Sequence, residues 1–129
     1  MSKYILDASA LLALLNSEPG SEIVQTLLPS SIMSTVNVAE VVSELNKRLN
    51  IDPNKAREMV TTMISQIVPF DLNQAVEAGR LRKITQHLGL SLGDRACIAL
   101  SIFHNYPIYT ADKLWANLQL HNTDIKLIR

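Results

Sequence analysis

The sequence predicts an α/β domain with a central, mainly parallel sheet. Short apolar runs typical of buried strands alternate along the chain with longer helical segments. Helix caps and terminators separate these segments, and no repeat or flexible linker divides them. The chain has 129 residues, of which 47% are hydrophobic. This is the size and composition of one ordinary domain, so we expect a single domain over residues 1–129.

Each predicted element has a chemical signal at one of its ends. Asn37 is a good N-cap, Asp71 is a further candidate cap, Asp52-Pro53 places a cap before a proline at the first helical position, and Gly89 is a typical terminator. In chain order we expect a strand at 3–7, helices at 8–16 and 21–28, a strand at 32–35, helices at 37–49 and 52–67, an extended piece at 68–70, helices at 71–87 and 90–105, and strands at 107–110 and 125–128.

The composition excludes several classes of protein. Twelve Lys and Arg balance twelve Asp and Glu, so the chain has neither the high net charge typical of disorder nor the basic excess of a non-specific polyanion binder. The only cysteine is Cys97, which excludes an internal disulfide and a cysteine-based zinc cluster. Its apolar neighbours predict a buried, inert thiol.

The sequence gives no sign of membrane attachment. No apolar run approaches the roughly 20 residues of a membrane span. The first apolar stretch is interrupted by an acid at Asp7, so it does not read as a signal peptide. We therefore expect a cytoplasmic protein with no membrane partner.

Four acids lie inside or against apolar runs, where an unpaired carboxylate is costly to bury. Asp7 follows Tyr-Ile-Leu, and Glu40 lies within Val-Asn-Val-Ala-Glu-Val-Val. Asp94 precedes Arg-Ala-Cys-Ile-Ala-Leu, and Asp112 follows Pro-Ile-Tyr-Thr-Ala. These four are the candidate functional residues.

The placement of these acids predicts one shared site. Asp7 and Asp112 each come just after an apolar strand, at the sheet edge where open α/β sheets bind ligands. Glu40 and Asp94 lie near the beginnings of helices, which brings them towards the same edge. Clustered carboxylates without a thiolate suit Mg²⁺ or Mn²⁺, and the matching chemistry is hydrolysis of a phosphodiester.

Each acid also has an ordinary structural explanation. Asp94 can cap the helix that it precedes, and Arg95 and Lys113 are adjacent partners for an ion pair. Taken singly, such roles are as probable as a functional one. Four of them together, each at the end of an element, are much less probable.

The same residues carry a family resemblance that covers essentially the whole chain. The chain resembles the PIN-domain ribonucleases, specifically the VapC-like toxins of type II toxin–antitoxin pairs. The resemblance rests on four blocks in order: Tyr4-Ile-Leu-Asp7-Ala-Ser9-Ala-Leu-Leu-Ala, Ser34-Thr-Val-Asn37-Val-Ala-Glu40-Val-Val, Leu90-Ser-Leu-Gly93-Asp94-Arg-Ala-Cys-Ile-Ala-Leu100 and Tyr109-Thr110-Ala-Asp112-Lys-Leu-Trp115.

The resemblance implies a three-layer α/β/α fold and hydrolysis of RNA by water with Mg²⁺ or Mn²⁺. It implies that the metal-binding, catalytic acids are Asp7, Glu40, Asp94 and Asp112, with supporting hydroxyls at Ser9 and Thr110. The implied partners are an RNA substrate, a second copy in a homodimer and a small antitoxin that crosses the helices at 19–28 and 52–67. DNA is implied only indirectly, through the antitoxin. Some relatives carry a further acid where this chain has Leu114, which leaves a second metal site in doubt.

Other polar residues are weaker candidates. Glu44 shares a helical face with Glu40 and can reach the rim of the site, although the sequence favours pairing with Arg48. Arg95 is next to an expected site acid and can contact a substrate phosphate, with a salt bridge as the competing role. The three histidines, His87, His104 and His121, lack catalytic spacing and are expected to be structural or surface residues.

Three alternative functions remain at this point. An aspartyl-phosphate phosphatase usually needs a second Asp two residues after the first, where this chain has Ser9. A catalytically silent RNA-binding module is disfavoured by the four acids and by an aromatic content of only 5%. A solitary nuclease without an antitoxin differs only in its genetic neighbourhood.

Overall fold

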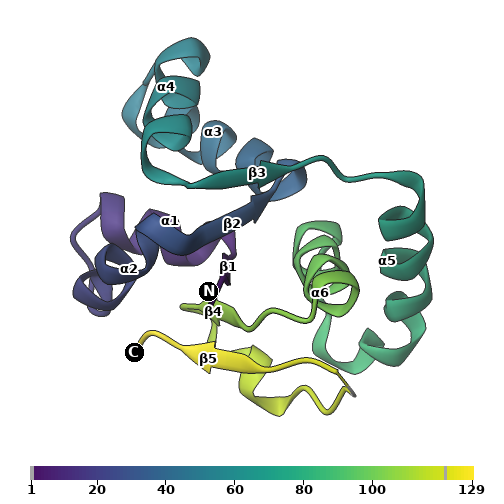
Figure 1. Ribbon diagram of the computed structural model, residues 1–129. Coiled ribbons are helices and arrows are strands. Elements are labelled where there is room, and N and C mark those ends of the chain that lie inside the picture. Colours follow the sequence, from purple (N-terminus) through teal and green to yellow (C-terminus); the bar gives the residue numbers. More distant parts are fainter. Residues whose placement is uncertain (1, 121) are drawn as a thin grey trace.

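The computed structural model describes residues 2–120 and 122–129, and its strands form one parallel sheet (Figure 1). The strand order is β3-β2-β1-β4-β5, and each neighbouring pair is parallel. The predicted α/β class with a central parallel sheet is confirmed. The elements are β1 (Tyr4–Leu6), α1 (Ala8–Leu15), α2 (Ser21–Leu27), η1 (Leu28–Ser30), β2 (Ser31–Ser34), α3 (Thr35–Leu49), α4 (Pro53–Met63), β3 (Gln66–Val68), α5 (Leu72–Ile84), η2 (Gln86–Leu88), α6 (Leu92–His104), β4 (Ile108–Thr110), η3 (Lys113–Asn117) and β5 (Ile125–Leu127), where η marks a 3₁₀ helix.

Side-chain caps fix where several helices begin. The Asp7 carboxylate accepts a hydrogen bond from the Ala10 amide at the start of α1. Asp52 and Asp71 cap α4 and α5 in the same way, as the sequence predicted, and Pro53 is at the first position of α4. Such caps satisfy backbone N–H groups that have no partner within the helix.

The predicted start of α3 at Asn37 is wrong. The helix begins at Thr35, and its cap is Ser34, whose hydroxyl accepts a hydrogen bond from the Val36 amide. Asn37 therefore lies within the first turn of the helix, where its side chain is free for another role.

The predicted boundary between α4 and β3 is also wrong. The helix ends at Met63 and not near Ile67, and the strand covers Gln66–Val68. Tertiary pairing decides this boundary, because Ile67 is in register with Met33 of β2. Likewise α5 ends at Ile84, and a 3₁₀ turn occupies the residues just before Gly89.

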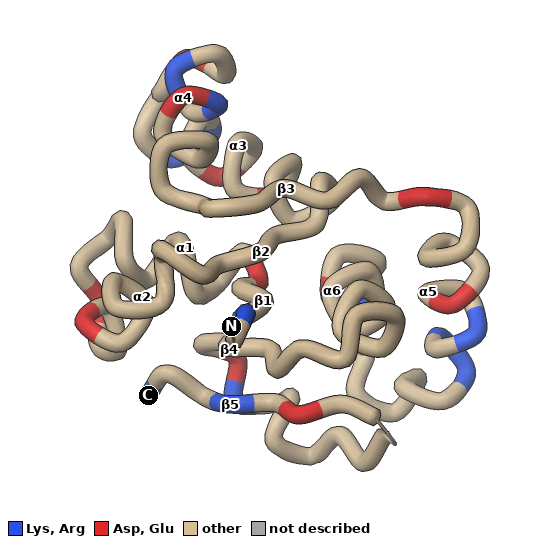
Figure 2. The backbone as a smooth tube through the Cα atoms, viewed as in Figure 1, with Lys and Arg blue, Asp and Glu red and all other residues tan. Residues whose placement is uncertain are grey.

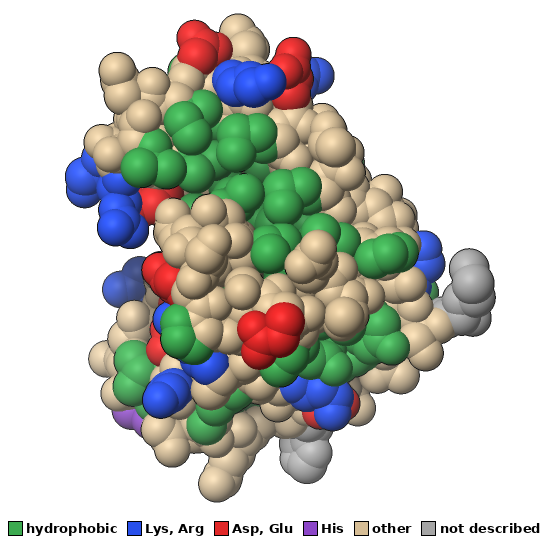
Figure 3. Space-filling view, turned by 90° about the vertical axis from the view of Figure 1, so that its left-hand side faces the viewer, with side chains coloured by type: hydrophobic (Ala, Val, Ile, Leu, Met, Phe, Trp, Pro, Cys, Tyr) green, Lys and Arg blue, Asp and Glu red, His purple; other side chains and the backbone are tan. Residues whose placement is uncertain are grey.

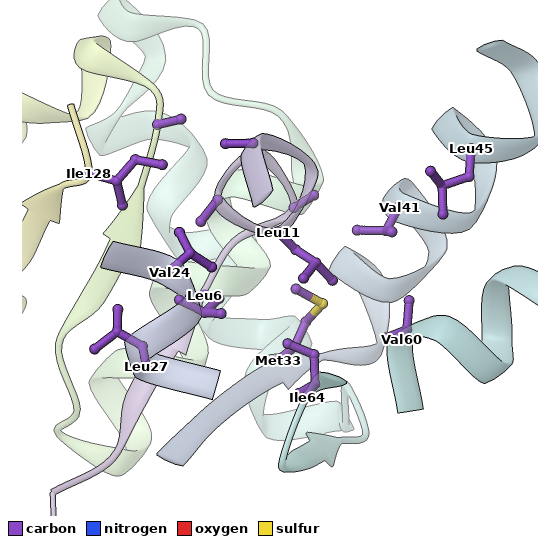
Figure 4. Packing of buried hydrophobic residues seen from close by; sticks show 14 of the residues in the cluster. Leu6, Leu11, Val24, Leu27, Met33, Val41, Leu45, Val60, Ile64 and Ile128 are labelled. Atoms are coloured by element: carbon purple, nitrogen blue, oxygen red, sulfur yellow. The ribbon is translucent and has the colours of Figure 1, made fainter. Parts of the chain in front are cut away.

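Alternate residues of the inner strands point to two separate cores. Leu6 and Met33 pack on one face of the sheet with α1, α2, α3 and α4 (Figure 4). Ile5 and Ile32 pack on the other face with α5, α6 and Trp115 of η3. The sheet is thus the middle layer of a three-layer α/β/α domain, as the family resemblance implied. None of the helices that the structure describes is long and apolar enough to cross a membrane.

Truncation of a core residue tests this packing. Leu11 is fully buried in the first core, whereas Leu49 is 57% exposed. We expect Leu11→Ala to lower the free energy of unfolding by about 2–5 kcal/mol, because it removes buried methyl groups and leaves a cavity. The same change at Leu49 should cost no more than about 0.5 kcal/mol. Urea unfolding measures both, and equal losses would contradict the packing described here.

Candidate active site

The strand order creates a crevice at the carboxyl ends of β1 and β4. β1 lies between β2 and β4 in the sheet, so the strands that follow it in sequence lie on both of its sides. Ligands of open α/β sheets bind at such a switch point, outside the carboxyl ends of the strands. Asp7 directly follows β1, and Asp112 follows β4 by two residues. Both acids therefore border the crevice.

One pocket at this edge contains all four acids that the sequence singled out. Its volume is about 270 Å³. In Figure 2, acidic positions lie near β1 and β4 and on α6, while basic positions are spread over several elements, including α4, α5 and β5. The pocket is lined by Asp7, Ala8, Ser9, Leu12, Glu40, Glu44, Asp94 and Asp112.

Asp7 is the most firmly held of these acids. It is only 4% exposed. Ser9 Oγ donates to its two carboxylate oxygens at 2.8 and 2.9 Å, Thr110 Oγ1 donates to Oδ2 at 2.6 Å, and the Ala10 amide donates to Oδ1 at 2.9 Å. The two hydroxyls in turn accept hydrogen bonds from the amides of Ala111 and Asp112. This network joins the end of β1 to the end of β4 and fixes the orientation of the Asp7 carboxylate.

The environment of the pocket opposes negative charge on its two more buried acids. Burial raises the pKa of Asp7 from 3.8 to about 6, and the negative charge of Asp94 adds to the rise, while the hydrogen bonds from Thr110, Ser9 and Ala10 oppose it. Burial likewise raises the pKa of Glu40, with a further contribution from Asp94 and an opposing hydrogen bond from Asn37. A nearby cation would relieve this cost.

Two residues that the sequence argument did not select hold Glu40. The Asn37 side-chain amide donates to Glu40 Oε1 at 2.8 Å and to the Gly93 carbonyl at 3.1 Å. A Cβ atom at Gly93 would overlap the Glu40 carboxyl group. The only advance signals were that Asn37 precedes Glu40 by three residues, which places both on one helical face, and that a glycine precedes Asp94.

Asp94 and Asp112 also act as helix caps. The Asp94 carboxylate accepts from the Ser91 amide at 3.0 Å, and Ser91 Oγ accepts from the Asp94 amide, which forms a capping box. Asp112 Oδ1 accepts from the Leu114 amide at 3.0 Å. The expectation that Asp94 precedes the helix and caps it is wrong in its position: Ser91 is the N-cap, and Asp94 lies in the first turn as its partner in the capping box. Both acids remain half-exposed in the pocket.

Among the described residues, no basic side chain pairs with these four acids. Within residues 2–120 and 122–129, none of them forms a salt bridge, so the expected alternatives with Arg95 and Lys113 do not occur. In the same residues, no three His, Cys, Asp or Glu side chains stand in positions that could hold one metal ion. The donor set nevertheless has the chemistry of a divalent-cation site, because it consists of carboxylate oxygens of which two resist ionisation without a cation.

Of the two weaker candidates, Glu44 lies at the pocket and Arg95 does not. Glu44 lines the pocket and also pairs with Arg48 at 3.5 Å, so it combines both roles that we considered. Arg95 does not line the pocket: it is 8% exposed and donates to the Ala78 carbonyl of α5 at 2.9 Å. Consecutive helical residues point about 100° apart, so proximity to Asp94 in sequence does not bring Arg95 to the site.

Cys97, His87 and His104 lie outside the pocket lining. Cys97 is a free, buried thiol, as predicted, and burial raises its pKa well above the usual value. His104 stacks on Tyr106 with ring centroids 6.0 Å apart, and His87 is in η2. His121 lies outside the described residues.

The comparisons with known proteins place the chain in a family. The model of the PIN domain family matches residues 4–119. This match spans most of the chain, which therefore belongs to the PIN domain family. A search of curated proteins finds no match.

Solved structures with the same fold include several toxin–antitoxin proteins. The chain is similar to DNA-bound VapBC from Salmonella typhimurium, with a TM-score of 0.73, 16% identity and 100% of both chains covered. It is similar to Mycobacterium tuberculosis VapC20, described as a sarcin-ricin loop cleaving toxin, with a TM-score of 0.75, 16% identity and coverage of 92% of this chain and 97% of that one. It is also similar to VapBC2 from Rickettsia felis bound to a promoter DNA fragment, with a TM-score of 0.73, 16% identity and coverage of 96% of this chain and 97% of that one. These likenesses establish the shared fold.

The raised pKa of Asp7 predicts how the stability of the metal-free protein depends on pH. Its folded-state pKa of about 6 exceeds the ordinary 3.8, so the folded state disfavours the charged carboxylate. Below about pH 4, the titration of Asp7 therefore does not change the free energy of unfolding. Between about pH 4 and pH 6 it lowers this free energy increasingly, by about 3 kcal/mol in total. Urea unfolding in the presence of a chelator measures this effect. Between pH 4.5 and 7.5, the free energy of unfolding of Asp7→Asn should rise relative to that of the wild type. A difference that does not change with pH would contradict this prediction.

Proposed function

We propose that this chain is a metal-dependent endoribonuclease and the toxin of a toxin–antitoxin pair. The observation that carries the proposal is the pocket of four carboxylates at the switch point, with no salt bridge to any of them in the described residues. Membership of the PIN domain family and the fold shared with VapC20 support it. A solitary nuclease is the second reading, and the absence of a neighbouring antitoxin gene would favour it.

The pocket residues would have different roles in such a reaction. Asp7, Glu40, Asp94 and Asp112 would hold Mg²⁺ or Mn²⁺. When bound, such an ion would supply Lewis acidity and lower the pKa of a coordinated water. Ser9 and Thr110 keep the Asp7 carboxylate in one orientation. Glu44 lies at the rim and adds negative charge there, which disfavours phosphate binding unless a cation is present.

We propose that the antitoxin docks on the side of the molecule that carries α2 and α4. Figure 3 shows this side, where hydrophobic side chains form a broad continuous area. It includes a groove of about 320 Å³ lined by Lys55, Glu58, Met59, Thr62 and Met63. Met59 and Met63 are partly buried, and their flexible side chains suit an adaptable contact with a partner segment. The proposed homodimer has a separate apolar surface available on α5, where Leu72 and Val76 are exposed one helical turn apart.

Removal of one pocket acid tests the proposed activity. We expect Asp94→Asn to lower RNA cleavage by at least about 100-fold, because changes in groups that merely orient metal ligands already cost 10–100-fold. The purified chain is incubated with total bacterial RNA and Mn²⁺, and cleavage ends are sequenced. Wild-type products should carry 5′-phosphates, and a chelator should abolish them. Products with 2′,3′-cyclic phosphates would rule out attack by water.

Asp52→Asn is the matched control for this experiment. Both Asp52 and Asp94 accept a backbone hydrogen bond at a helix start, and asparagine preserves that bond at each position. Asp52 is exposed and lies outside the pocket lining. The control should cleave RNA like the wild type. Equal loss in both variants would show that the acid pocket has no special role.

A methyl group at Gly93 tests the position of Glu40. Gly93→Ala introduces a Cβ that overlaps the Glu40 carboxyl group, and the flexible glutamate side chain can move away. We expect a folded protein with a melting temperature close to that of the wild type and cleavage reduced by about 10–100-fold. Gly79→Ala on α5 meets no atom within 4 Å and should leave cleavage unchanged. Full activity of Gly93→Ala would contradict a role for Glu40 in its present position.

A further inference from the structure

Asn37 is a buried polar residue that connects α3 to α6. It is 1% exposed. Its amide nitrogen donates one hydrogen to Glu40 Oε1 at 2.8 Å and the other to the Gly93 carbonyl at 3.1 Å. Both neighbours are acceptors, so only this orientation of the amide is compatible with an ionised Glu40. The side chain thus presents its donor side to the pocket acid.

The amide oxygen of Asn37 has no hydrogen-bond partner among the described residues. Within the described residues, its Oδ1 atom is buried and accepts no hydrogen bond. Buried polar atoms are nearly always paired, and an exception calls for an explanation. The oxygen therefore makes no contact that explains why an amide stands at this position. The contacts of the nitrogen with Glu40 and Gly93 are what the residue provides.

Glu40 depends on this contact more than Asp7 depends on any single donor. Asp7 receives hydrogen bonds from Ser9, Thr110 and the Ala10 amide. Glu40 has a longer, more flexible side chain, and among the described residues Asn37 is its only hydrogen-bond donor. Gly93 leaves the space that the carboxyl group occupies.

We propose that Asn37 is a positioning residue that holds the Glu40 carboxylate in the acid pocket. Its amide fixes Oε1, and Oε2, which accepts no hydrogen bond from the described residues, remains available to a cation. This inference rests on the proposed function, in which Glu40 is a metal ligand. Asn37 acts through Glu40 and touches neither RNA nor the ion.

Binding of Mn²⁺ alone, measured by calorimetry on the purified chain, tests the inference without relying on cleavage. We expect Asn37→Asp, which replaces the donor with a second acceptor, and Asn37→Ala, which removes both amide atoms, to weaken binding by about 10–100-fold. RNA cleavage should show a lower kcat with little change in KM. The control is Asn46→Asp, on the exposed part of the same helix, where the side chain contacts only the Ile51 carbonyl. It adds the same charge and should bind Mn²⁺ like the wild type.

A double-mutant cycle distinguishes positioning from a general structural effect. In the Glu40→Gln background, adding Asn37→Ala should weaken Mn²⁺ binding less than about two-fold, because its effect passes through Glu40. An equal loss in both backgrounds, or no loss in the wild-type background, would overturn the positioning role. If Glu40→Gln itself leaves Mn²⁺ binding and cleavage intact, the proposed metal site fails, and the inference about Asn37 fails with it.

Discussion

The electrostatic cost of grouping carboxylates at one sheet edge is the constraint on which the site depends. Asp7 is buried at the end of the central strand, and its pKa is raised to about 6 by that burial and by the nearby charge of Asp94. No basic side chain among the described residues offsets this charge. The protein instead restrains the carboxylates with neutral donors, which orient them without neutralising them. A nearby cation would relieve this cost.

The parallel topology explains how residues far apart in sequence meet at this edge. β1 and β4 are neighbours, so Thr110 reaches Asp7 across 103 positions of the chain. α3 follows β2 directly and carries Glu40 one turn in, while the capping box at Ser91 begins α6 beside it. Two cores, one on each face of the sheet, hold these helices in place. The rigidity of the layers is therefore what gives the pocket its geometry.

Local chemistry explains which features could be predicted from the sequence. The strands around Asp7 and Asp112 were found because apolar runs ended in acids, and the caps at Asp52 and Asp71 because the side chains act on their own helices. The strand at Ile67 was missed because only its pairing with Met33 distinguishes it from a continued helix. Arg95 was misjudged for a similar reason, because its partner Ala78 lies 17 positions away. Asn37 was predicted to be a cap because Ser34, a better-placed cap, was assigned to the strand, and its contact with Gly93 spans 56 positions.

Anomalous X-ray diffraction from a crystal of the purified chain soaked in Mn²⁺ tests the central claim most directly. The acid pocket should give an anomalous difference peak in contact with Asp7 and at least two of Glu40, Asp94 and Asp112. The same soak of Asp7→Asn crystals should weaken or remove that peak. A wild-type pocket without a peak, at Mn²⁺ concentrations that support RNA cleavage, would contradict the claim that these carboxylates form a metal site.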